Sequence, residues 1–236
     1  MDISRLRAAF PERRIEYYDE VDSTMLAAAC LPLRSVVLAE RQTAGQGRHG
    51  RTWHSEPGNG IYCSVVLEPT PFLTLALGLA AQQAIVDAVG IACDLRWPND
   101  LMLNGRKVGG ILVQLVDGSA IAGIGINVNH GSFPAELAEE ATSLRLAAGR
   151  EIAREEILVA LLAAIDAFAA ESGETILRLF TQASSYAVGR RVRVEQPGGV
   201  VVGTTEGLDP AGYLRVRQDD GTVTLIVAGG VRALSA

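Results

Sequence analysis

The feature that most constrains this chain is a short segment rich in glycine and arginine and closed by a tryptophan. The segment reads Gly45-Gln46-Gly47-Arg48-His49-Gly50-Arg51, and Trp53 follows it. Glycine lets the backbone adopt positive φ and approach a ligand closely. The two arginines supply forked donors suited to carboxylate and phosphate oxygens. The segment therefore predicts a loop that holds an anion. The alternative is a plain surface turn, which needs neither the arginines nor the tryptophan.

The three glycines also match the spacing of the dinucleotide-binding fingerprint. That fingerprint needs a helix that opens at its last glycine, so that the helix N-terminus meets the pyrophosphate. Strands are predicted on either side, at residues 35–40 and 61–67. The residues between them include Pro57, Gly58 and Gly60, which indicate a long loop instead of a helix. The fingerprint thus lacks its structural context, and we set that fold aside.

Composition indicates an ordinary globular protein of 236 residues, with 48% hydrophobic and 20% charged residues. The net charge of −6 argues against broad nucleic-acid binding. We expect no signal peptide, and the most apolar stretch, residues 73–89, predicts a buried helix instead of a membrane span. A cytoplasmic location without a membrane partner follows as an expectation. Cysteine and histidine spacing matches no metal pattern, so we expect reduced core thiols and no ligand cluster. These residues are Cys30, Cys63, Cys93, His49, His54 and His130.

Turn signals predict an antiparallel meander in the middle of the chain. Asn104-Gly105 is a strong hairpin signal before a strand at residues 107–116, and a second tight turn precedes a strand at 120–129. Glycines inside these strands weaken them unless something approaches closely. A flat apolar ligand on the sheet is one explanation, and β-bulges are the other. The glycines are Gly109, Gly110, Gly123 and Gly125.

Helices are predicted at residues 71–89, 151–170 and 174–186, and the composition changes after Tyr186. Short alternating strands separated by turns, one of them at residues 197–199, then predict a small barrel. We therefore expect a domain at residues 1–186 and a small β domain at 187–236.

Polar residues form a second candidate site around the predicted hairpin. Asn99, Asp100 and Lys107 flank the turn, and Asn127 and Asn129 end the following strand. Asn and Asp in turns usually bond to nearby backbone, and a lysine there is usually solvated. Helix capping is likewise the ordinary role for Ser23 and Thr24. If these groups instead converge with the arginines, cations would neutralise charge developing on a phosphate.

The chain resembles biotin protein ligases over nearly its whole length. The matching segments occur in the family's order and are Asp22–Thr24, Glu40–Gln42, Gly45–Trp53, Arg96–Asp100, Lys107–Leu112 and Gly125–Asn127. The resemblance implies an α+β fold in which a mixed or antiparallel sheet with flanking helices, like that of class II synthetases, precedes a small SH3-like β-barrel. Some relatives begin with a DNA-binding domain. Here Asp22 leaves no room for one, so we expect no operator binding.

The resemblance also implies a two-step reaction. The biotin carboxylate first attacks the α-phosphate of ATP, giving biotinyl-5′-AMP and pyrophosphate. A lysine of a biotin carboxyl carrier protein, of the acetyl-CoA carboxylase type, then attacks the mixed anhydride and releases AMP. Mg²⁺ would accompany the nucleotide, without a metal site of the protein. Relatives include monomers and dimers, and exposed sheet edges make a homodimer plausible.

The resemblance assigns roles to individual residues. The catalytic residues would be Arg48, Lys107 and Asp100, with Asp100 placing or deprotonating the incoming lysine. The biotin-binding residues would be Ser23, Thr24, Met25, Gln42, Gln46, Gly47, Arg48, Lys107 and Gly110. The ATP-binding residues would be Arg48, Arg51, Trp53, Asn99 and Asn127, with Trp53 covering the adenine.

Four positions depart from the family pattern. Relatives often carry arginine where Gln46 stands and a polar residue such as asparagine where Met25 stands. They usually carry glutamate where Gln114 stands and an acidic residue near Val231. The missing cation at Gln46 is expected to weaken retention of the adenylate without removing activity.

Two other functions are compatible with the same residues. A lipoate–protein ligase of related fold is one, since a fold alone does not fix the acid. A non-catalytic biotin-binding sensor is the other, although a pure binder would not need groups for both a carboxylate and a nucleotide. An octanoyl transferase would need a nucleophilic cysteine, and none of the three has a convincing setting.

Overall fold

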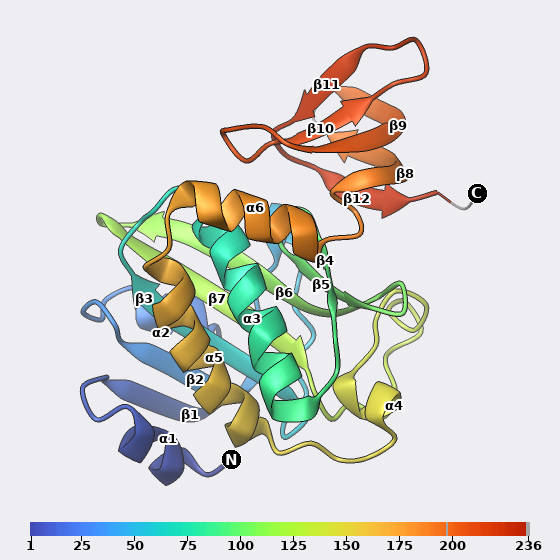
Figure 1. Cartoon of the computed structure of the whole chain (residues 1–236). Helices are drawn as coiled ribbons and strands as arrows, with labels where there is room; N and C mark the ends of the chain where they lie inside the picture. Colours follow the sequence, from blue (N-terminus) through green and yellow to red (C-terminus); the bar gives the residue numbers. More distant parts are fainter. Residues whose placement is uncertain (197, 235–236) are drawn as a thin grey trace.

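The computed structural model describes residues 1–196 and 198–234 (Figure 1). Within them a seven-stranded sheet runs in the order β1-β2-β3-β7-β6-β5-β4. Its strands are β1 (Ile15–Val21), β2 (Val36–Gln42), β3 (Gly60–Leu67), β4 (Asp94–Arg96), β5 (Asp100–Leu103), β6 (Arg106–Val116) and β7 (Ser119–Asn127). β1 and β2 are parallel and the other neighbours are antiparallel, so the predicted mixed sheet is confirmed.

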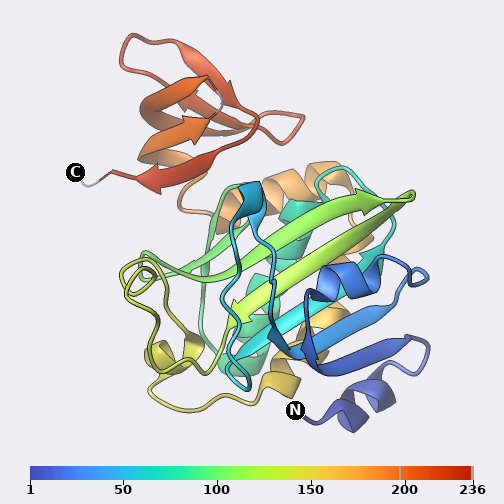
Figure 2. The same cartoon turned by 180° about the vertical axis from the view of Figure 1, so that it is seen from behind.

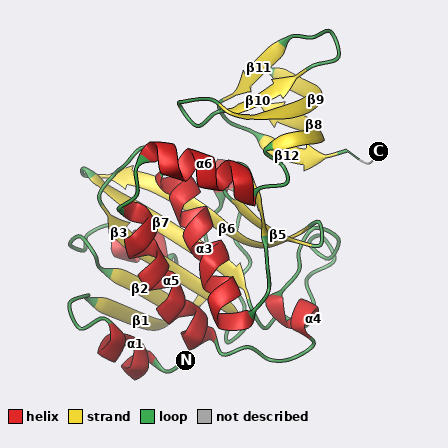
Figure 3. Ribbon diagram, in the orientation of Figure 1, coloured by secondary structure: helices red, strands yellow, loops and turns green. Residues whose placement is uncertain are grey.

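Helices cover the two faces of this sheet unequally (Figure 3). They are α1 (Ile3–Ala9), α2 (Thr24–Ala28), α3 (Leu73–Val89), α4 (Leu144–Ala148), α5 (Arg154–Ala169) and α6 (Gly173–Ala183), with the 3₁₀ turn η1 (Arg48–Gly50). The long helices α3 and α5 pack on one face, and α6 crosses one end of α3 (Figure 1). Among the described residues, the opposite face carries the short α2 and the loop between β2 and β3 (Figure 2).

Side-chain alternation in β2 shows how both faces are built. Val36 and Leu38 join the large core beneath the long helices. Val37 points the other way and packs with Met25 of α2 and Val66 of β3 in a second, smaller cluster. Successive strand residues point to opposite faces, so one strand can serve both clusters. The α2 face of the sheet therefore carries the smaller of the two clusters.

The predicted meander is confirmed, and its turns have the expected geometry. Asn104 and Gly105 have φ of 51° and 77°, and Asp117 and Gly118 have φ of 47° and 83°. Positive φ at both central residues is the requirement of a type I′ hairpin turn. β6 and β7 pair without a register shift across their glycines, so β-bulges between these two strands do not explain the glycines. A register shift is present between β5 and β6.

The C-terminal part forms a five-stranded antiparallel sheet within the described residues, in the order β11-β10-β9-β8-β12. Its strands are β8 (Val188–Gln196), β9 (Gly199–Leu208), β10 (Leu214–Arg217), β11 (Val223–Ile226) and β12 (Gly230–Ala233). The Trp97 indole N–H donates a 2.9 Å hydrogen bond to the Gly212 carbonyl and so ties this sheet to the larger part. Pro197 of the predicted turn lies outside the described residues, as do residues 235 and 236 of the predicted domain.

Several elements were not predicted, and one expectation is wrong. α1, β1, β4, α4 and β12 lack a clear apolar period, and in β1 only Ile15 is buried. Cys63 and Cys93 are buried as expected, and burial raises the pKa of each thiol to about 12. Cys30 is exposed and is no core thiol.

No described helix is long and apolar enough to span a membrane.

A partly buried ion pair connects β2 to the start of α5. Arg154 donates to both Glu40 oxygens, at 2.9 and 3.1 Å, and also to the Gly60 carbonyl. Tyr17 and the Gly58 N–H complete the bonds to the carboxylate. Burial by itself would raise the pKa of Glu40, but the bonds from Arg154 and Tyr17 outweigh it and lower this pKa to about 2.

Replacing Glu40 by glutamine should therefore leave Arg154 without its charge partner. We expect the free energy of unfolding at pH 7 to fall by about 1–3 kcal/mol. The folded-state pKa is about 2 against an ordinary 4.5, so the contribution is present above the ordinary pKa and is lost as pH falls toward 2. Urea unfolding at pH 7 and pH 3 should show the wild-type advantage shrinking at the lower pH.

Glu20→Gln is the matched control, since Glu20 pairs with Arg41 at 3.1 Å while both side chains are about half exposed. Its effect should stay below about 0.5 kcal/mol. Equal losses of unfolding free energy in the two variants would mean that the Glu40–Arg154 pair stabilises the fold no more than an exposed ion pair does.

Candidate functional site

A hollow opens on the α2 face of the large sheet, with an empty volume of about 460 Å³ counted to its open mouth. Its walls come from α2, the β2–β3 loop, and β3, β6 and β7. The lining residues are Ser23, Thr24, Met25, Gln42, Gln46, Gly47, Arg48, Trp53, Tyr62, Cys63, Asn99, Lys107, Gly110, Ile111, Leu112, Gly123, Ile124 and Gly125.

The floor of the hollow depends on three glycines. A Cβ at Gly125 would lie 2.5 Å from Trp53 Cε2, and one at Gly110 would lie 3.3 Å from the same indole. A Cβ at Gly123 would lie 2.7 Å from the Met25 sulfur. The glycines were expected to allow a group to approach these strands closely. In the structure that group is a side chain of the protein itself, Trp53 or Met25. The indole lies against the sheet at Gly110 and Gly125, where a larger residue would exclude it.

One end of the hollow is lined by hydroxyl and amide groups. Thr24 bonds through its backbone N–H and its hydroxyl to Gln42 Oε1, at 2.9 and 3.1 Å, and its hydroxyl lies 2.8 Å from Ser64 Oγ. Ser23 stands at the N-cap of α2, yet its side chain makes no capping bond. Its buried Oγ has no hydrogen-bond partner in the described part of the chain. Capping therefore does not explain Ser23, and a buried free hydroxyl marks a place for a polar ligand atom.

The glycine–arginine segment closes on itself beside this end. Gly47 N–H donates to the Arg51 carbonyl at 2.7 Å, and Arg48–Gly50 form only a single 3₁₀ turn. Of the three glycines only Gly50 has positive φ, at 73°, and His49 shares that conformation at 57°. Gly45 and Gly47 serve close packing, since a Cβ there would lie 2.8 Å from the Trp53 carbonyl and 3.1 Å from that of Arg51. No helix follows, so rejection of the dinucleotide fingerprint is confirmed.

Cations gather at the other end around one carboxylate. Lys107 Nζ lies 2.5 Å and Arg96 Nη2 lies 2.7 Å from Asp100. Arg48 donates to Asn99 Oδ1 at 2.9 Å, and Asn99 in turn donates to the Ile111 carbonyl. Three cations against one carboxylate leave this end positive, so it attracts anions.

The pKa values at this end follow from burial and charge. Burial would raise the pKa of Asp100, but Lys107 and Arg96 outweigh it and hold the pKa below its ordinary 3.8. Burial lowers the pKa of Arg48, against the pull of Asp100. A guanidinium stays charged at neutral pH all the same. The Asp100 carboxylate is therefore ionised at neutral pH.

The structure brings most of the sequence-predicted site residues together. Those that line the hollow are Ser23, Thr24, Met25, Gln42, Gln46, Gly47, Arg48, Trp53, Asn99, Lys107 and Gly110. Arg51, Asp100 and Asn127 are not among the lining residues. Arg51 is exposed on the loop, and the Asn127 amide donates to the Thr142 carbonyl at 3.1 Å. Asn129 is structural, since its amide bonds the Ile152 backbone twice.

Other lining residues were not predicted as site residues. They are Tyr62, Cys63, Ile111, Leu112 and Ile124, with Gly123 and Gly125 foreseen only as places of close approach. Their strands were predicted, but the edge of a hollow is set by packing across strands. Cys63 does not suggest nucleophilic catalysis, because burial raises the pKa of its thiol to about 12.

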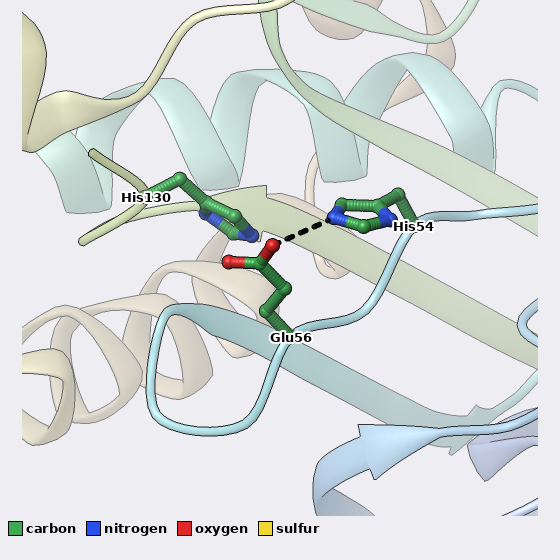
Figure 4. Close-up of side chains that lie close together, drawn as sticks. All are labelled: His54, Glu56 and His130. Atoms are coloured by element: carbon green, nitrogen blue, oxygen red, sulfur yellow. Dashed lines mark hydrogen bonds and ion pairs between the residues drawn. The ribbon is translucent and has the colours of Figure 1, made fainter. Parts of the chain in front are cut away.

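The expectation that the histidines form no ligand cluster is wrong for two of them. His54 and His130 lie beside Glu56, with one ligand atom of each residue within 4.8 Å of the others (Figure 4). His54 Nε2 is 3.2 Å from Glu56 Oε1. Burial lowers the pKa of His130 to about 4. Sequence spacing cannot reveal a cluster whose members come from separate loops.

Comparison with known proteins agrees with this geometry. The "Biotin/lipoate A/B protein ligase family" profile matches residues 19–130, and the "Biotin protein ligase C terminal domain" profile matches residues 187–231. The chain is 36% identical over 226 residues to the bifunctional ligase/repressor BirA of Bacillus subtilis, covering 87% of this chain and 70% of that protein. It is 34% identical over 208 residues to the biotin–[acetyl-CoA-carboxylase] ligase of Mycobacterium tuberculosis, covering 83% and 77%.

A solved structure gives the same result in three dimensions. The biotin protein ligase of Aquifex aeolicus, in complex with biotin and ATP, superposes with a TM-score of 0.85 at 30% identity. The match covers 94% of this chain and 99% of that one. The chain therefore belongs to the biotin/lipoate A/B protein ligase family. Within that family it is a biotin protein ligase, as the sequence resemblance implied.

Gly125→Ala tests the floor of the hollow. The added methyl group would overlap the Trp53 ring, so we expect the indole to leave the sheet and the free energy of unfolding to fall by about 1–3 kcal/mol. Tryptophan fluorescence should shift to longer wavelength, with the buried Trp97 as a constant background.

Gly131→Ala is the control, because a Cβ at Gly131 meets nothing within 4 Å. An unshifted spectrum for Gly125→Ala, or the same shift in both variants, would contradict the described packing.

Proposed function

We propose that this hollow performs both half-reactions of biotin attachment, with the roles of individual residues as follows. The enzyme activates biotin with ATP and transfers it to a carboxylase carrier protein. The assignment to this hollow rests on one observation, namely that neutral polar groups and cations lie at opposite ends of it. Hydroxyl and amide groups line one end, a glycine floor lies between, and Arg48 and Lys107 stand at the other.

The polar end would receive the ring system of biotin. Ser23 offers its unpartnered hydroxyl, and the Thr24–Gln42 pair fixes further donors and acceptors beside it. Met25 contributes apolar surface over Gly123. The remaining biotin contacts proposed from the family pattern are Gln46, Gly47, Arg48, Lys107 and Gly110.

The cationic end would hold the carboxylate of biotin and the α-phosphate of ATP. Two anions approach each other in the first step, so positive charge is required at the point where they meet. The carboxylate oxygen forms a bond to the α-phosphorus as the bond to pyrophosphate breaks. We assign this neutralisation to Arg48 and Lys107. Asn99, which accepts from Arg48, would position that guanidinium for the nucleotide.

The rest of the nucleotide would lie over the loop and the end of β7. We propose Trp53 as the adenine contact, with Arg51 and Asn127 as further nucleotide contacts. The exposed Arg51 is free to turn toward a phosphate. Asn127 stands two residues beyond Gly125 at the end of β7, on the same face of the sheet.

The family pattern gives Asp100 the role of placing or deprotonating the incoming lysine, and we propose instead that it acts through Lys107. Because Lys107 and Arg96 lower its pKa, the carboxylate is a weak base toward the incoming lysine. It is well placed to orient Lys107, 2.5 Å away. In the second step the neutral amine of the carrier lysine attacks the biotinyl carbonyl, an amide forms as the acyl C–O bond to AMP breaks, AMP leaves with the bonding electrons, and the amine releases one proton to solvent.

Mg²⁺ is proposed to enter with the phosphates of ATP. It prefers several oxygen ligands. The carboxylate at the cationic end, Asp100, is already paired with Lys107 and Arg96, so these residues do not form a magnesium site by themselves.

Two departures from the family pattern lie in contact. Gln114 donates to Gln46 Oε1 at 3.4 Å, and this contact is exposed. The family resemblance leads us to expect arginine often at position 46 and glutamate usually at position 114, so here a neutral amide pair stands in place of opposite charges. We propose that this contact keeps the loop over the hollow with little dependence on salt. Val231 lies in the core of the small sheet and has no part in the site.

Other expectations stay predictions. They are the domain division at residues 1–186 and 187–236, pairing of two copies through an open sheet edge, the lack of operator binding and a cytoplasmic location.

The activity test is the mass of a biotin carrier domain after incubation with the protein, Mg·ATP and biotin, with lipoate in parallel. We expect a biotin-sized gain on one lysine and no lipoyl product. Biotin-dependent exchange of pyrophosphate into ATP measures the first step alone. In Arg48→Gln and Lys107→Ala, kcat/KM for this exchange should fall by about 10²–10³ through the loss of a cation that stabilises the transition state.

Arg106→Ala is the matched control, since this exposed cation neighbours Lys107 on the same hairpin. A gain with lipoate alone would reassign the substrate. Biotin binding without either product would favour a sensor, and full activity of Arg48→Gln would remove its catalytic role.

Ser23→Ala separates ligand binding from folding. The hydroxyl has no partner in the described structure, so its removal should leave thermal stability of the free protein unchanged or slightly higher. Biotin affinity should fall about 5–30-fold, as for the loss of one hydrogen bond to a buried polar atom. Calorimetry with biotin and thermal unfolding without it test both halves. A fall in stability with unchanged affinity would make Ser23 structural.

A further inference from the structure

A second group of side chains lies outside the reaction assigned above. His54 and Glu56 come from the loop before β3, and His130 follows the end of β7. The two imidazoles approach the Glu56 carboxylate from opposite sides (Figure 4). One nitrogen from each histidine and one oxygen of Glu56 all lie within 4.8 Å of one another.

His130 is the least satisfied member of this group. Its side chain is fully buried, and both ring nitrogens lack a hydrogen-bond partner among the described residues. The ring is held in place, because it stacks on Phe133 with centroids 5.1 Å apart and Ser143 Oγ donates to the His130 carbonyl at 2.6 Å. Buried polar groups are nearly always paired. This fixed, buried imidazole therefore has both ring nitrogens available to a ligand.

Glu56 is oriented by neighbours that leave one carboxylate oxygen for the histidines. Asn59 Nδ2 donates to Oε2 at 2.9 Å. Tyr62 OH accepts from the Glu56 N–H at 2.8 Å and donates to its carbonyl at 3.0 Å, which fixes the backbone. Supporting bonds of this kind are what orient the ligands of protein metal sites.

We propose that His54, Glu56 and His130 bind a divalent transition-metal ion of the Zn²⁺ type, with water in the fourth position. Two imidazoles and a carboxylate are a common zinc ligand set, whereas Mg²⁺ and Ca²⁺ prefer oxygen alone. Bonds of about 2.0–2.1 Å in a tetrahedron place ligand atoms roughly 3.3 Å apart. The His54–Glu56 distance of 3.2 Å already meets this. The widest separation has to close by about 1.5 Å.

Binding would also have a local consequence. His54 follows Trp53, which lies on the floor of the hollow, and His130 follows the strand that supplies part of that floor. An ion held by both would fasten the loop to the end of β7. The site does not depend on the reaction proposed above.

Equilibrium dialysis of the metal-stripped full chain against Zn²⁺ tests the proposal, in a Cys30→Ser background that removes the exposed thiol. We expect one ion per chain, and Co²⁺ in its place should give the visible absorption of a tetrahedral site. Glu56→Gln and His54→Gln should each weaken Zn²⁺ binding at least tenfold. Both positions are partly exposed, so these variants should fold even if a buried His130→Gln does not.

His49→Asn is the matched control. His49 is exposed and has positive φ, which asparagine tolerates, so Zn²⁺ binding should not change. Equal binding by wild type, Glu56→Gln and His54→Gln would overturn the site and leave a hydrogen-bonded triad. Displacement of Zn²⁺ by a modest excess of Mg²⁺ would contradict the proposed ligand chemistry.

Discussion

The absence of side chains at three positions of β6 and β7 is the constraint on which the site depends. Gly110 and Gly125 are direct partners in the sheet, and Gly123 follows on the same face. Because none of the three has a side chain, the backbone of the sheet is exposed to close approach over this patch. Trp53 and Met25 settle onto that patch, and the β2–β3 loop is drawn over the sheet with the indole. A single Cβ would therefore disturb the floor and the loop at once.

The cations around this hollow are paired differently: two of them share a carboxylate of the protein, and one is bonded to a neutral amide. Asp100 takes up part of the charge of Lys107 and Arg96, whereas Arg48 is held by the neutral Asn99. Arg48, the cation that the β2–β3 loop itself carries, thus keeps its charge for a ligand. Such an arrangement is preorganised, since the donors are in place before charge develops on the substrate.

Sequence reasoning succeeded where a local rule decides the outcome. Asn104-Gly105 is a strong signal for a tight hairpin turn, and the predicted meander followed from it. It failed for β1, whose exposed edge position leaves no alternation to detect. The capping role of Ser23 was the ordinary interpretation, and only the burial of its unpaired hydroxyl corrects it. The contact of Gln46 with Gln114 and the meeting of His54 with His130 depend on tertiary packing, which spacing along the chain does not encode.

The unequal burial of the three cysteines has a practical consequence. Cys63 and Cys93 are buried with pKa values of about 12, whereas Cys30 is exposed two residues beyond α2. Thiol reagents require both access and thiolate. The native chain therefore carries one addressable attachment point, on the segment that begins with Ser23 and Thr24. A fluorophore or spin label introduced there without mutagenesis can follow the entry of a small molecule into the fold.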